Sequence, residues 1–158
     1  MRYRDEFDDS ELTIYARALN QRAKSLDAHG ELTAALLLDC ILSSGGRCGW
    51  CDESVVNSEF EIDHIFSLSA GGENTSENII LACPACNRSK GEMSPVRFAM
   101  QTVARTGYKT PLINRLLSRY DGDVYVQRRM FEDVPDTTPH HDEPPEDHPS
   151  TIPPYTWS

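Results

Sequence analysis

Apolar residues recur at helical spacing through the first part of the chain. Residues 10–28 carry one apolar stripe, made of Leu12, Tyr15, Ala16, Leu19, Ala23 and Leu26. This pattern predicts an amphipathic helix with Ser10 as its N-cap and Gly30 beyond its end. Residues 31–43 are more uniformly apolar and predict a second, more buried helix that stops at the glycine pair 45–46. Neither segment carries an obvious chemical group.

The middle of the chain changes between extended and polar stretches. Residues 55–65 contain β-branched and aromatic residues in partial alternation, which predicts a strand pair or hairpin. A polar loop follows at 67–76, and the apolar run 79–81 predicts a short strand. Pro84, in the first turn, opens a predicted helix that continues to about Lys90.

Two more helices are indicated by their N-terminal sequences. Ser94-Pro95 and Thr110-Pro111 each place a capping hydroxyl before a proline at the first helical position. These dipeptides predict helices over about 95–105 and 111–120. Residues 123–131 alternate weakly, as expected of either a strand or an extended arm.

The composition changes near residue 133. From there on the chain is rich in Pro, Asp and Glu and holds no Lys or Arg and few apolar residues. Such a segment cannot repay the entropy cost of ordering, so the tail is predicted to be disordered. The chain therefore divides into an N-terminal helical segment, a central core, a basic helical segment and an acidic Pro-rich tail, at residues 1–46, 47–92, 93–132 and 133–158.

The net charge of −10 is unevenly distributed. Residues 1–87 hold 6 Lys and Arg against 15 Asp and Glu, residues 88–129 hold 9 against 3, and residues 130–158 hold none against 7. Local potential rather than total charge governs contact with phosphate. The basic segment is therefore a candidate nucleic-acid surface, with Arg88, Lys90 and Arg97 as candidate phosphate contacts. The alternative is a solvated helix face that carries basic residues.

Two further features bear on location and partners. No run of 18 or more apolar residues occurs, and the N-terminus is too charged for a signal peptide. These features predict a soluble, cytoplasmic protein that does not contact a membrane. The acidic tail and the N-terminal helices are candidate docking segments for a protein partner.

Five cysteines fit a reducing compartment, and four of them form two Cys-x-x-Cys pairs. Four soft thiolates, at Cys48, Cys51, Cys83 and Cys86, predict a closed tetrahedral zinc site. The 31 residues between the pairs exceed what a compact zinc ribbon needs, so a folded insertion is expected there. Zinc would supply folding energy to that small insertion. The odd Cys40 lies in an apolar run and is expected to be buried and inert.

The insertion carries a second set of chemical groups. Neutral imidazole is the side chain best able to take a proton from water near pH 7, which makes His64 a candidate general base. Adjacent strand residues point to opposite faces, so Asp63 and His64 must have different tasks or lie at a bend. Asp63 is a candidate ligand of a divalent cation. Asn87, in the first turn of the next helix, is either a further ligand or a helix-capping residue.

Together these residues resemble the HNH endonuclease family, in its four-cysteine, zinc-bound branch. The resemblance covers residues 47–91 and rests on ordered motifs: Cys48-x-x-Cys51, Asp63-His64-Ile65, Ser69-x-Gly71-Gly72, Asn78-Ile-Ile-Leu81 and Cys83-x-x-Cys86-Asn87-x-x-Lys90-Gly91. It implies a ββα-metal core stapled by zinc. With the helices predicted on either side, the expected fold class is α+β.

The resemblance also implies roles for individual residues. It implies hydrolysis of DNA, with His64 as general base and Asp63 and Asn87 as ligands of a single catalytic cation. Asn78 would brace the loop and orient the histidine. Asn87 stands where other branches have histidine, which favours Mg²⁺ or Mn²⁺ over transition metals. Two alternatives stay open: a non-catalytic zinc module that binds DNA or protein, and a nuclease subunit of a larger nucleic-acid-processing complex.

Overall fold

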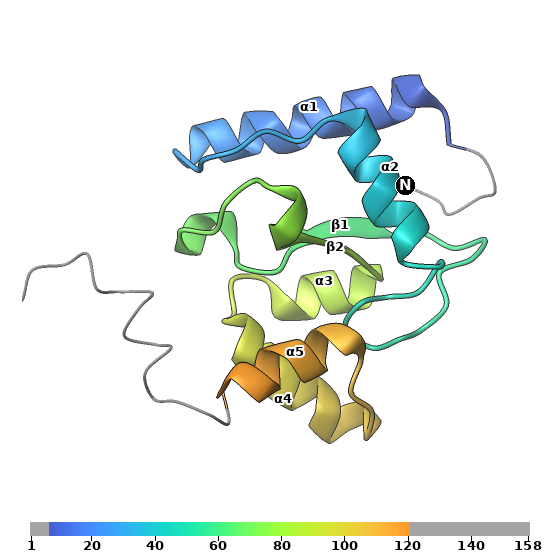
Figure 1. The fold of residues 1–158 in the computed structure, drawn as a ribbon, viewed down its shortest axis with the longest axis vertical. Helices are drawn as coiled ribbons and strands as arrows, with labels where there is room; N and C mark the ends of the chain where they lie inside the picture. Colours follow the sequence, from blue (N-terminus) through green and yellow to red (C-terminus); the bar gives the residue numbers. More distant parts are fainter. Residues whose placement is uncertain (1–6, 121–158) are drawn as a thin grey trace, which may run out of the picture.

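The computed structural model describes residues 7–120, and residues 1–6 and 121–158 lie outside the described part. The strand or arm expected at 123–131 and the acidic tail therefore fall outside it. In the described part, two helices are followed by a two-stranded sheet and three more helices (Figure 1). Two short 3-10 turns, Leu68–Ala70 and Ser76–Asn78, lie between the strands. The α+β class predicted from the sequence is confirmed.

Helices α1 (Asp9–Ser25) and α2 (Ala34–Ser43) form the N-terminal layer. The N-cap of α1 is Asp8 and not Ser10, because the Asp8 carboxylate accepts a hydrogen bond from the Ser10 amide at 2.7 Å. Helix α2 begins later than predicted because Thr33 caps it. The buried residues of α1 all belong to the predicted apolar stripe, and they are Leu12, Ala16, Leu19 and Ala23.

Strands β1 (Glu61–His64) and β2 (Ile79–Ala82) form the antiparallel sheet. Glu61 lies opposite Ala82, and His64 lies opposite Ile79. Of the strand pair or hairpin predicted within residues 55–65, one strand is confirmed as β1, and a turn precedes it in which the amide of Ser58 donates to the carbonyl of Val55 at 2.9 Å. The partner of β1 comes instead from much later in the sequence.

The helices cover the sheet from two sides. Helices α1 and α2 lie on one side and α3 (Pro84–Lys90) on the other, with α4 (Pro95–Thr106) and α5 (Pro111–Tyr120) beyond α3 (Figure 1). As predicted, Ser94 and Thr110 cap α4 and α5. Each hydroxyl accepts a hydrogen bond from the backbone amide three residues later, at 3.3 and 3.2 Å. No helix in residues 7–120 is both long and apolar enough to cross a membrane.

One hydrophobic cluster joins these layers, from Leu12 in α1 to Ile113 in α5. Trp50 and Phe60 are among its largest fully buried members. The ring of Trp50 packs edge-on against Phe98 of α4, with 5.1 Å between the ring centroids. The flanking helices are therefore packed into the same core as the segment between the two cysteine pairs.

Candidate active site and thiolate metal centre

Two turns of the chain bring the four paired cysteines together. Cys48 and Cys51 lie in the turn before the first strand, and Cys83 and Cys86 lie at the start of α3. All four sulfurs lie within 4.8 Å of one another, and the Cys51 and Cys83 sulfurs are 3.9 Å apart. Zn–S bonds of about 2.3 Å in a tetrahedron separate the sulfurs by roughly 3.8 Å. The cluster can therefore hold a zinc ion.

The thiols of this cluster do not ionise alike. A hydrogen bond with Cys86 lowers the pKa of Cys48 to about 5, whereas burial raises the pKa of Cys51 to about 12. Arg105 of α4 brings a positive charge to the cluster, with its Nη2 3.6 Å from the Cys86 sulfur. A bound dication would stabilise all four thiolates, which without it repel one another.

Gly49 lets the first cysteine turn lie directly on β2. Its amide donates to the carbonyl of Leu81 at 2.9 Å, and a Cβ at Gly49 would lie 1.8 Å from Cδ1 of Ile80. The hydroxyl of Thr110 donates to the carbonyl of Gly49 at 2.7 Å, which ties α5 to the same turn. The thiolate centre is thus fixed to the strand that pairs with β1.

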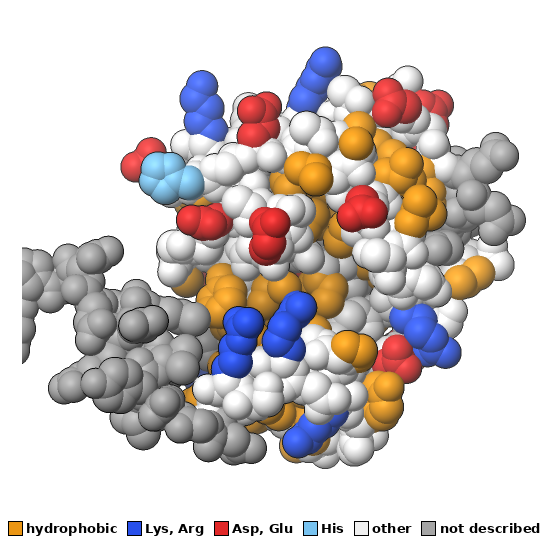
Figure 2. Space-filling view, in the orientation of Figure 1, with side chains coloured by type: hydrophobic (Ala, Val, Ile, Leu, Met, Phe, Trp, Pro, Cys, Tyr) orange, Lys and Arg blue, Asp and Glu red, His pale blue; other side chains and the backbone are white. Residues whose placement is uncertain are grey.

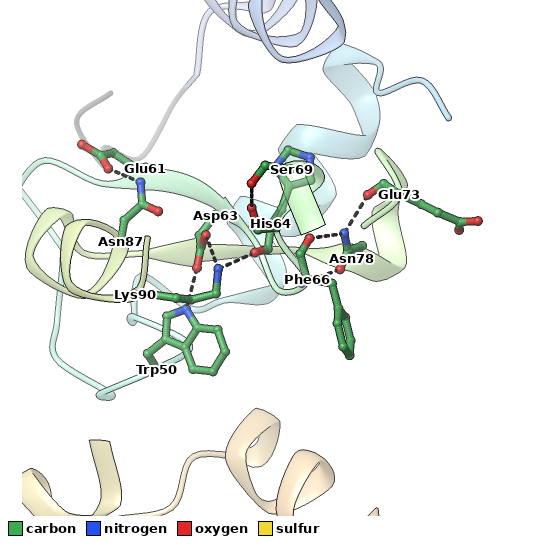
Figure 3. Close-up of polar contacts among 11 residues, drawn as sticks. Trp50, Glu61, Asp63, His64, Phe66, Ser69, Glu73, Asn78, Asn87 and Lys90 are labelled. Atoms are coloured by element: carbon green, nitrogen blue, oxygen red, sulfur yellow. Dashed lines mark hydrogen bonds and ion pairs between the residues drawn. The ribbon is translucent and has the colours of Figure 1, made fainter. Parts of the chain in front are cut away.

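Asp63 is a buried carboxylate with a partner on each oxygen. Its Oδ1 lies 2.9 Å from Nζ of Lys90, and its Oδ2 accepts a hydrogen bond from Nε1 of Trp50 at 2.8 Å (Figure 3). Burial raises the pKa of Asp63, and the Lys90 charge and the Trp50 hydrogen bond act against that rise. Each oxygen keeps a further lone pair, so the carboxylate is oriented while it can still bind a cation.

The imidazole of His64 meets a different set of partners from Asp63, as strand alternation predicted. Its Nε2 lies 2.9 Å from Oδ1 of Asn74, which belongs to the loop between the strands. Burial lowers the pKa of His64, against the opposing effects of the Asn74 hydrogen bond and the Asp63 charge. A lowered pKa favours the neutral imidazole, the form that can accept a proton.

Asn87 extends from α3 toward the first residue of β1. Its Nδ2 donates a short hydrogen bond to Oε2 of Glu61 (Figure 3). The N-cap of α3 is Cys83, whose sulfur accepts a hydrogen bond from the Cys86 amide at 3.4 Å. Asn87 is therefore not the capping residue of this helix, and its amide oxygen has no hydrogen-bond partner among the described residues.

One cavity of about 230 Å³ brings the chemical groups together. Its lining includes Asp63 and His64 from β1, Asn87 from α3 and Arg22 from α1. A carboxylate, a neutral imidazole and an amide around one open space are the groups that hydrolysis with a hard divalent cation requires. The guanidinium of Arg22 adds a positive charge to the same lining.

The HNH endonuclease family model matches residues 46–92, which contain both cysteine pairs, both strands and α3. These residues are an HNH endonuclease domain. The resemblance seen in the sequence is thereby confirmed for this segment.

Two known nucleases are similar to the chain that carries this HNH domain. The CRISPR-associated endonuclease Cas9 of Corynebacterium diphtheriae is 29% identical over 79 residues, which are 48% of this chain and 7% of that protein. The structure of the Type IV phosphorothioation-dependent restriction endonuclease ScoMcrA gives a TM-score of 0.31 at 20% identity, over 72% of this chain and 23% of that one. The chain thus spans less than a quarter of the length of either protein.

Asn78 braces the loop that connects the two strands of the HNH domain. Its Oδ1 accepts from the amide of Phe66 at 2.9 Å, and its Nδ2 donates to the carbonyls of Phe66 and Glu73 at 2.9 and 2.7 Å (Figure 3). All three bonds go to backbone groups, and none of them goes to the His64 ring. The bracing of the loop is therefore seen directly, and the orienting role implied for Asn78 stays a prediction.

The burial of Lys90 was not predicted from the sequence. The residue is only 2% exposed, and its Nζ lies 2.9 Å from Asp63 and 2.6 Å from the carbonyl oxygen of His64. The ammonium is held by these two partners at the lining of the cavity, and the DNA contact at Lys90 stays a prediction. Arg88 and Arg97 are both exposed and stay candidates.

The sequence did not reveal the residues that hold the HNH side chains in place. These residues are Asn20, Trp50, Glu61 and Asn74. Asn20 left only a weak signal, as a polar residue beside the apolar stripe of α1. Asn74 lies in a polar loop without periodicity, where no local pattern distinguishes one Asn from another. The hydrogen bond between Asn20 and Asn74 joins positions that are 54 residues apart in the chain.

Proposed function

We propose that this chain is a metal-dependent endonuclease that hydrolyses DNA phosphodiester bonds. The observation that carries the proposal is that Asp63, His64 and Asn87 line the same cavity. These three residues lie inside the segment that matches the HNH endonuclease model. The similarity to a protein named as a Cas9 endonuclease supports the same class of activity.

His64 serves as the general base in the proposed reaction. The neutral imidazole takes a proton from a water molecule as the water oxygen bonds to phosphorus. The bond between phosphorus and the 3′-oxygen then breaks, and the leaving oxygen takes up a proton from solvent. A bound divalent cation supplies neutralisation of the charge that develops on the phosphate and on the leaving oxygen.

Asp63 and Asn87 are the residues that would hold this cation. Both donors are oxygens, which suit Mg²⁺ or Mn²⁺. The ammonium of Lys90, 2.9 Å from Asp63, opposes a second positive charge at the same carboxylate. Cation binding should therefore be weak in the free protein and strengthened by the phosphate of a bound substrate, as is usual for Mg²⁺ sites.

Zinc has a separate, structural role in this proposal. Four thiolates leave no open coordination position for water or substrate, which is typical of structural zinc sites. The sheet that carries Asp63 and His64 has only two strands, and Gly49 fastens the thiolate turn to β2. Zinc on the four cysteines would keep the cavity assembled without taking part in the reaction.

The DNA contacts are proposed on the basic side of the molecule. Helices α4 and α5 hold no acidic residue and four arginines, namely Arg97, Arg105, Arg115 and Arg119. Most of the charged side chains over the lower part of the face in Figure 2, where these helices lie, are Lys or Arg. Arg88 on α3 and Arg22 at the cavity extend the positive charge toward the site. Phosphate contacts by these residues would position a duplex without reading its sequence.

A plasmid cleavage assay tests the proposal. Purified zinc-loaded protein is incubated with supercoiled plasmid in Mg²⁺, in Mn²⁺, in Zn²⁺ alone and without added metal. We expect conversion to nicked circles in Mg²⁺ or Mn²⁺ only, because the thiolate site cannot supply the catalytic cation.

Two results would count against the proposal. Cleavage that is equally fast without any added divalent cation would exclude the assigned role of Asp63 and Asn87. Plasmid binding with no cleavage in any metal would instead favour the non-catalytic zinc module.

A further inference from the structure

We infer that Asn20 and Asn74 are positioning residues that fix the tautomer and the orientation of His64. The geometry points to a relay of hydrogen bonds that begins at the peptide groups of Leu32 and ends at the imidazole. The inference rests on the proposed function where it treats His64 as a base, but the tautomer itself can be measured without cleavage.

The relay begins at the backbone amide and carbonyl of Leu32, whose donor and acceptor roles cannot be exchanged. The side chain of Asn20 makes two hydrogen bonds to the backbone of Leu32, each 2.8 Å long. The Leu32 amide can only donate and its carbonyl can only accept. The Asn20 amide is therefore locked with Oδ1 toward the Leu32 amide and Nδ2 toward the Leu32 carbonyl.

The orientation of Asn20 in turn fixes the orientation of the Asn74 side-chain amide. Nδ2 of Asn74 donates to Oδ1 of Asn20 at 2.7 Å, and the carbonyl of Gly30 lies 3.5 Å from the same nitrogen. Both neighbours are acceptors, so a flipped Asn74 would bring oxygen against oxygen. Asn74 is fully buried, and its backbone amide is tied to the carbonyl of His29 at 2.7 Å. Its Oδ1 must consequently face His64.

The third step sets the proton on the imidazole. Because the group facing Nε2 at 2.9 Å is a carbonyl oxygen, Nε2 must carry hydrogen in the neutral ring. The lone pair is then on Nδ1. Nδ1 of His64 has no hydrogen-bond partner among residues 7–120. The one completely buried, unpartnered side-chain nitrogen or oxygen of that range is Oγ1 of Thr102, so Nδ1 is not completely buried. His64 lines the cavity, so Nδ1 is the nitrogen available to a water molecule there.

The relay makes the N-terminal helices part of the active site. Asn20 belongs to α1 and Leu32 to the connection before α2, and both lie outside residues 46–92. Without Asn20, only the Gly30 carbonyl, at the longer distance of 3.5 Å, would favour this orientation of the Asn74 amide, which could otherwise present either its oxygen or its nitrogen to the ring. The tautomer of His64, inside the HNH segment, is therefore set by Asn20, on a helix that precedes this segment.

The direct test is nitrogen NMR of the neutral ring in ¹⁵N-labelled, zinc-loaded protein without DNA. The His64 signals are assigned from the spectrum of a His64→Gln variant. We expect a pyrrole-type Nε2 and a pyridine-type Nδ1. A wild-type spectrum with the proton on Nδ1 would overturn the inference, whatever the cleavage rates are.

A matched set of variants tests the source of the tautomer. Asn20→Leu removes the relay, whereas Asn20→Asp keeps an acceptor toward Leu32 and Asn74 and loses the same donor to the Leu32 carbonyl. We expect both tautomers in Asn20→Leu, with cleavage at least about tenfold slower than in Asn20→Asp, because a misoriented catalytic group typically loses this much rate. Gln21→Leu, an exposed neighbour on the same helix, controls for surface substitution and should match wild type.

These outcomes separate the relay from the proposed function. An unchanged His64 tautomer and rate in a folded Asn20→Leu protein would overturn the relay and leave the nuclease proposal intact. A wild-type protein with the expected tautomer but no cleavage in any metal would contradict the nuclease proposal and support the relay as a structural feature.

Discussion

Lys90 and Asp63 form an ion pair in the interior of the HNH domain. Both charges are nearly sealed from solvent, with side-chain exposures of 1% and 7%. Desolvating two charges is costly and is offset only when further hydrogen bonds satisfy them. Trp50 supplies such a bond to Asp63, and the His64 carbonyl supplies one to Lys90. The pair therefore holds the carboxylate and the backbone of the base in one arrangement.

Replacing Lys90 should show how strongly the stability of the domain depends on this ion pair. We expect Lys90→Met to lower the free energy of unfolding by about 3–5 kcal/mol, because it leaves Asp63 buried and uncompensated. Urea denaturation of the zinc-loaded protein measures the change. Arg88→Met, at an exposed position on the same helix, should change the stability by no more than about 0.5 kcal/mol. Equal effects of the two substitutions would contradict the structural role given to Lys90.

At the residue scale, the sequence revealed the chemical groups but not their partners. Strand alternation predicted different tasks for Asp63 and His64, and their side chains have different hydrogen-bond partners although both line one cavity. The burial of Lys90 could not be foreseen, because a Lys at a helix end is usually solvated and its partner lies 27 residues earlier. The Asn20–Asn74 contact spans 54 residues and likewise leaves no local pattern.

At the scale of elements, the sequence predicted helices better than strands. The capping hydroxyls of α4 and α5 are local signals, so their starts at Pro95 and Pro111 matched the prediction. Residues 55–65 supplied one strand, β1, but not its partner, because strand pairing depends on distant neighbours and not on local preference. The start of α1 differs from the prediction because Asp8 and Ser10 are both good caps, and Asp8 makes the capping hydrogen bond.

Thr110 offers a test at the scale of elements, because its hydroxyl has two tasks. It accepts a hydrogen bond from the Ile113 amide at the start of α5 and donates one to the Gly49 carbonyl beside the cysteine turn. We expect Thr110→Val to lower the free energy of unfolding by about 1–2 kcal/mol, because it removes the cap of α5 and leaves the half-buried Gly49 carbonyl without its donor. Thr110→Ser keeps the hydroxyl and should recover most of this loss in the same urea experiment. A Thr110→Val protein as stable as wild type would show that the hydroxyl does not link the two segments.

At the scale of the whole molecule, the four-thiolate centre compensates for a small sheet. Two four-residue strands cannot form an independently stable unit, so packing and metal must hold them. The hydrophobic cluster reaches from α1 to α5 and passes through Trp50, which lies between the first cysteine pair. The thiolate centre and the core should therefore assemble together.

Removing zinc should disrupt this assembly. We expect a strong chelator to abolish the near-ultraviolet circular dichroism of the packed aromatic core and to make unfolding non-cooperative, and added zinc to restore both. Cys48→Ser should give protein with less than one zinc per chain. Cys40→Ser is the matched control, because Cys40 lies outside the cluster and burial raises its pKa to about 11. Full zinc binding by a folded Cys48→Ser protein would contradict the assigned ligand set.

The central claim is that His64 is the base of a nuclease site, and single-turnover cleavage of a duplex in Mg²⁺ tests it most directly. The comparison is between wild type, His64→Ala and His29→Ala, each checked for one zinc per chain and an unchanged circular dichroism spectrum. His29 is exposed and contributes only its carbonyl to the relay, so its side chain serves as the matched control. The account predicts that His64→Ala cleaves about 10²–10⁴-fold more slowly while His29→Ala matches wild type. A folded, zinc-loaded His64→Ala protein that cleaves at the wild-type rate would contradict it.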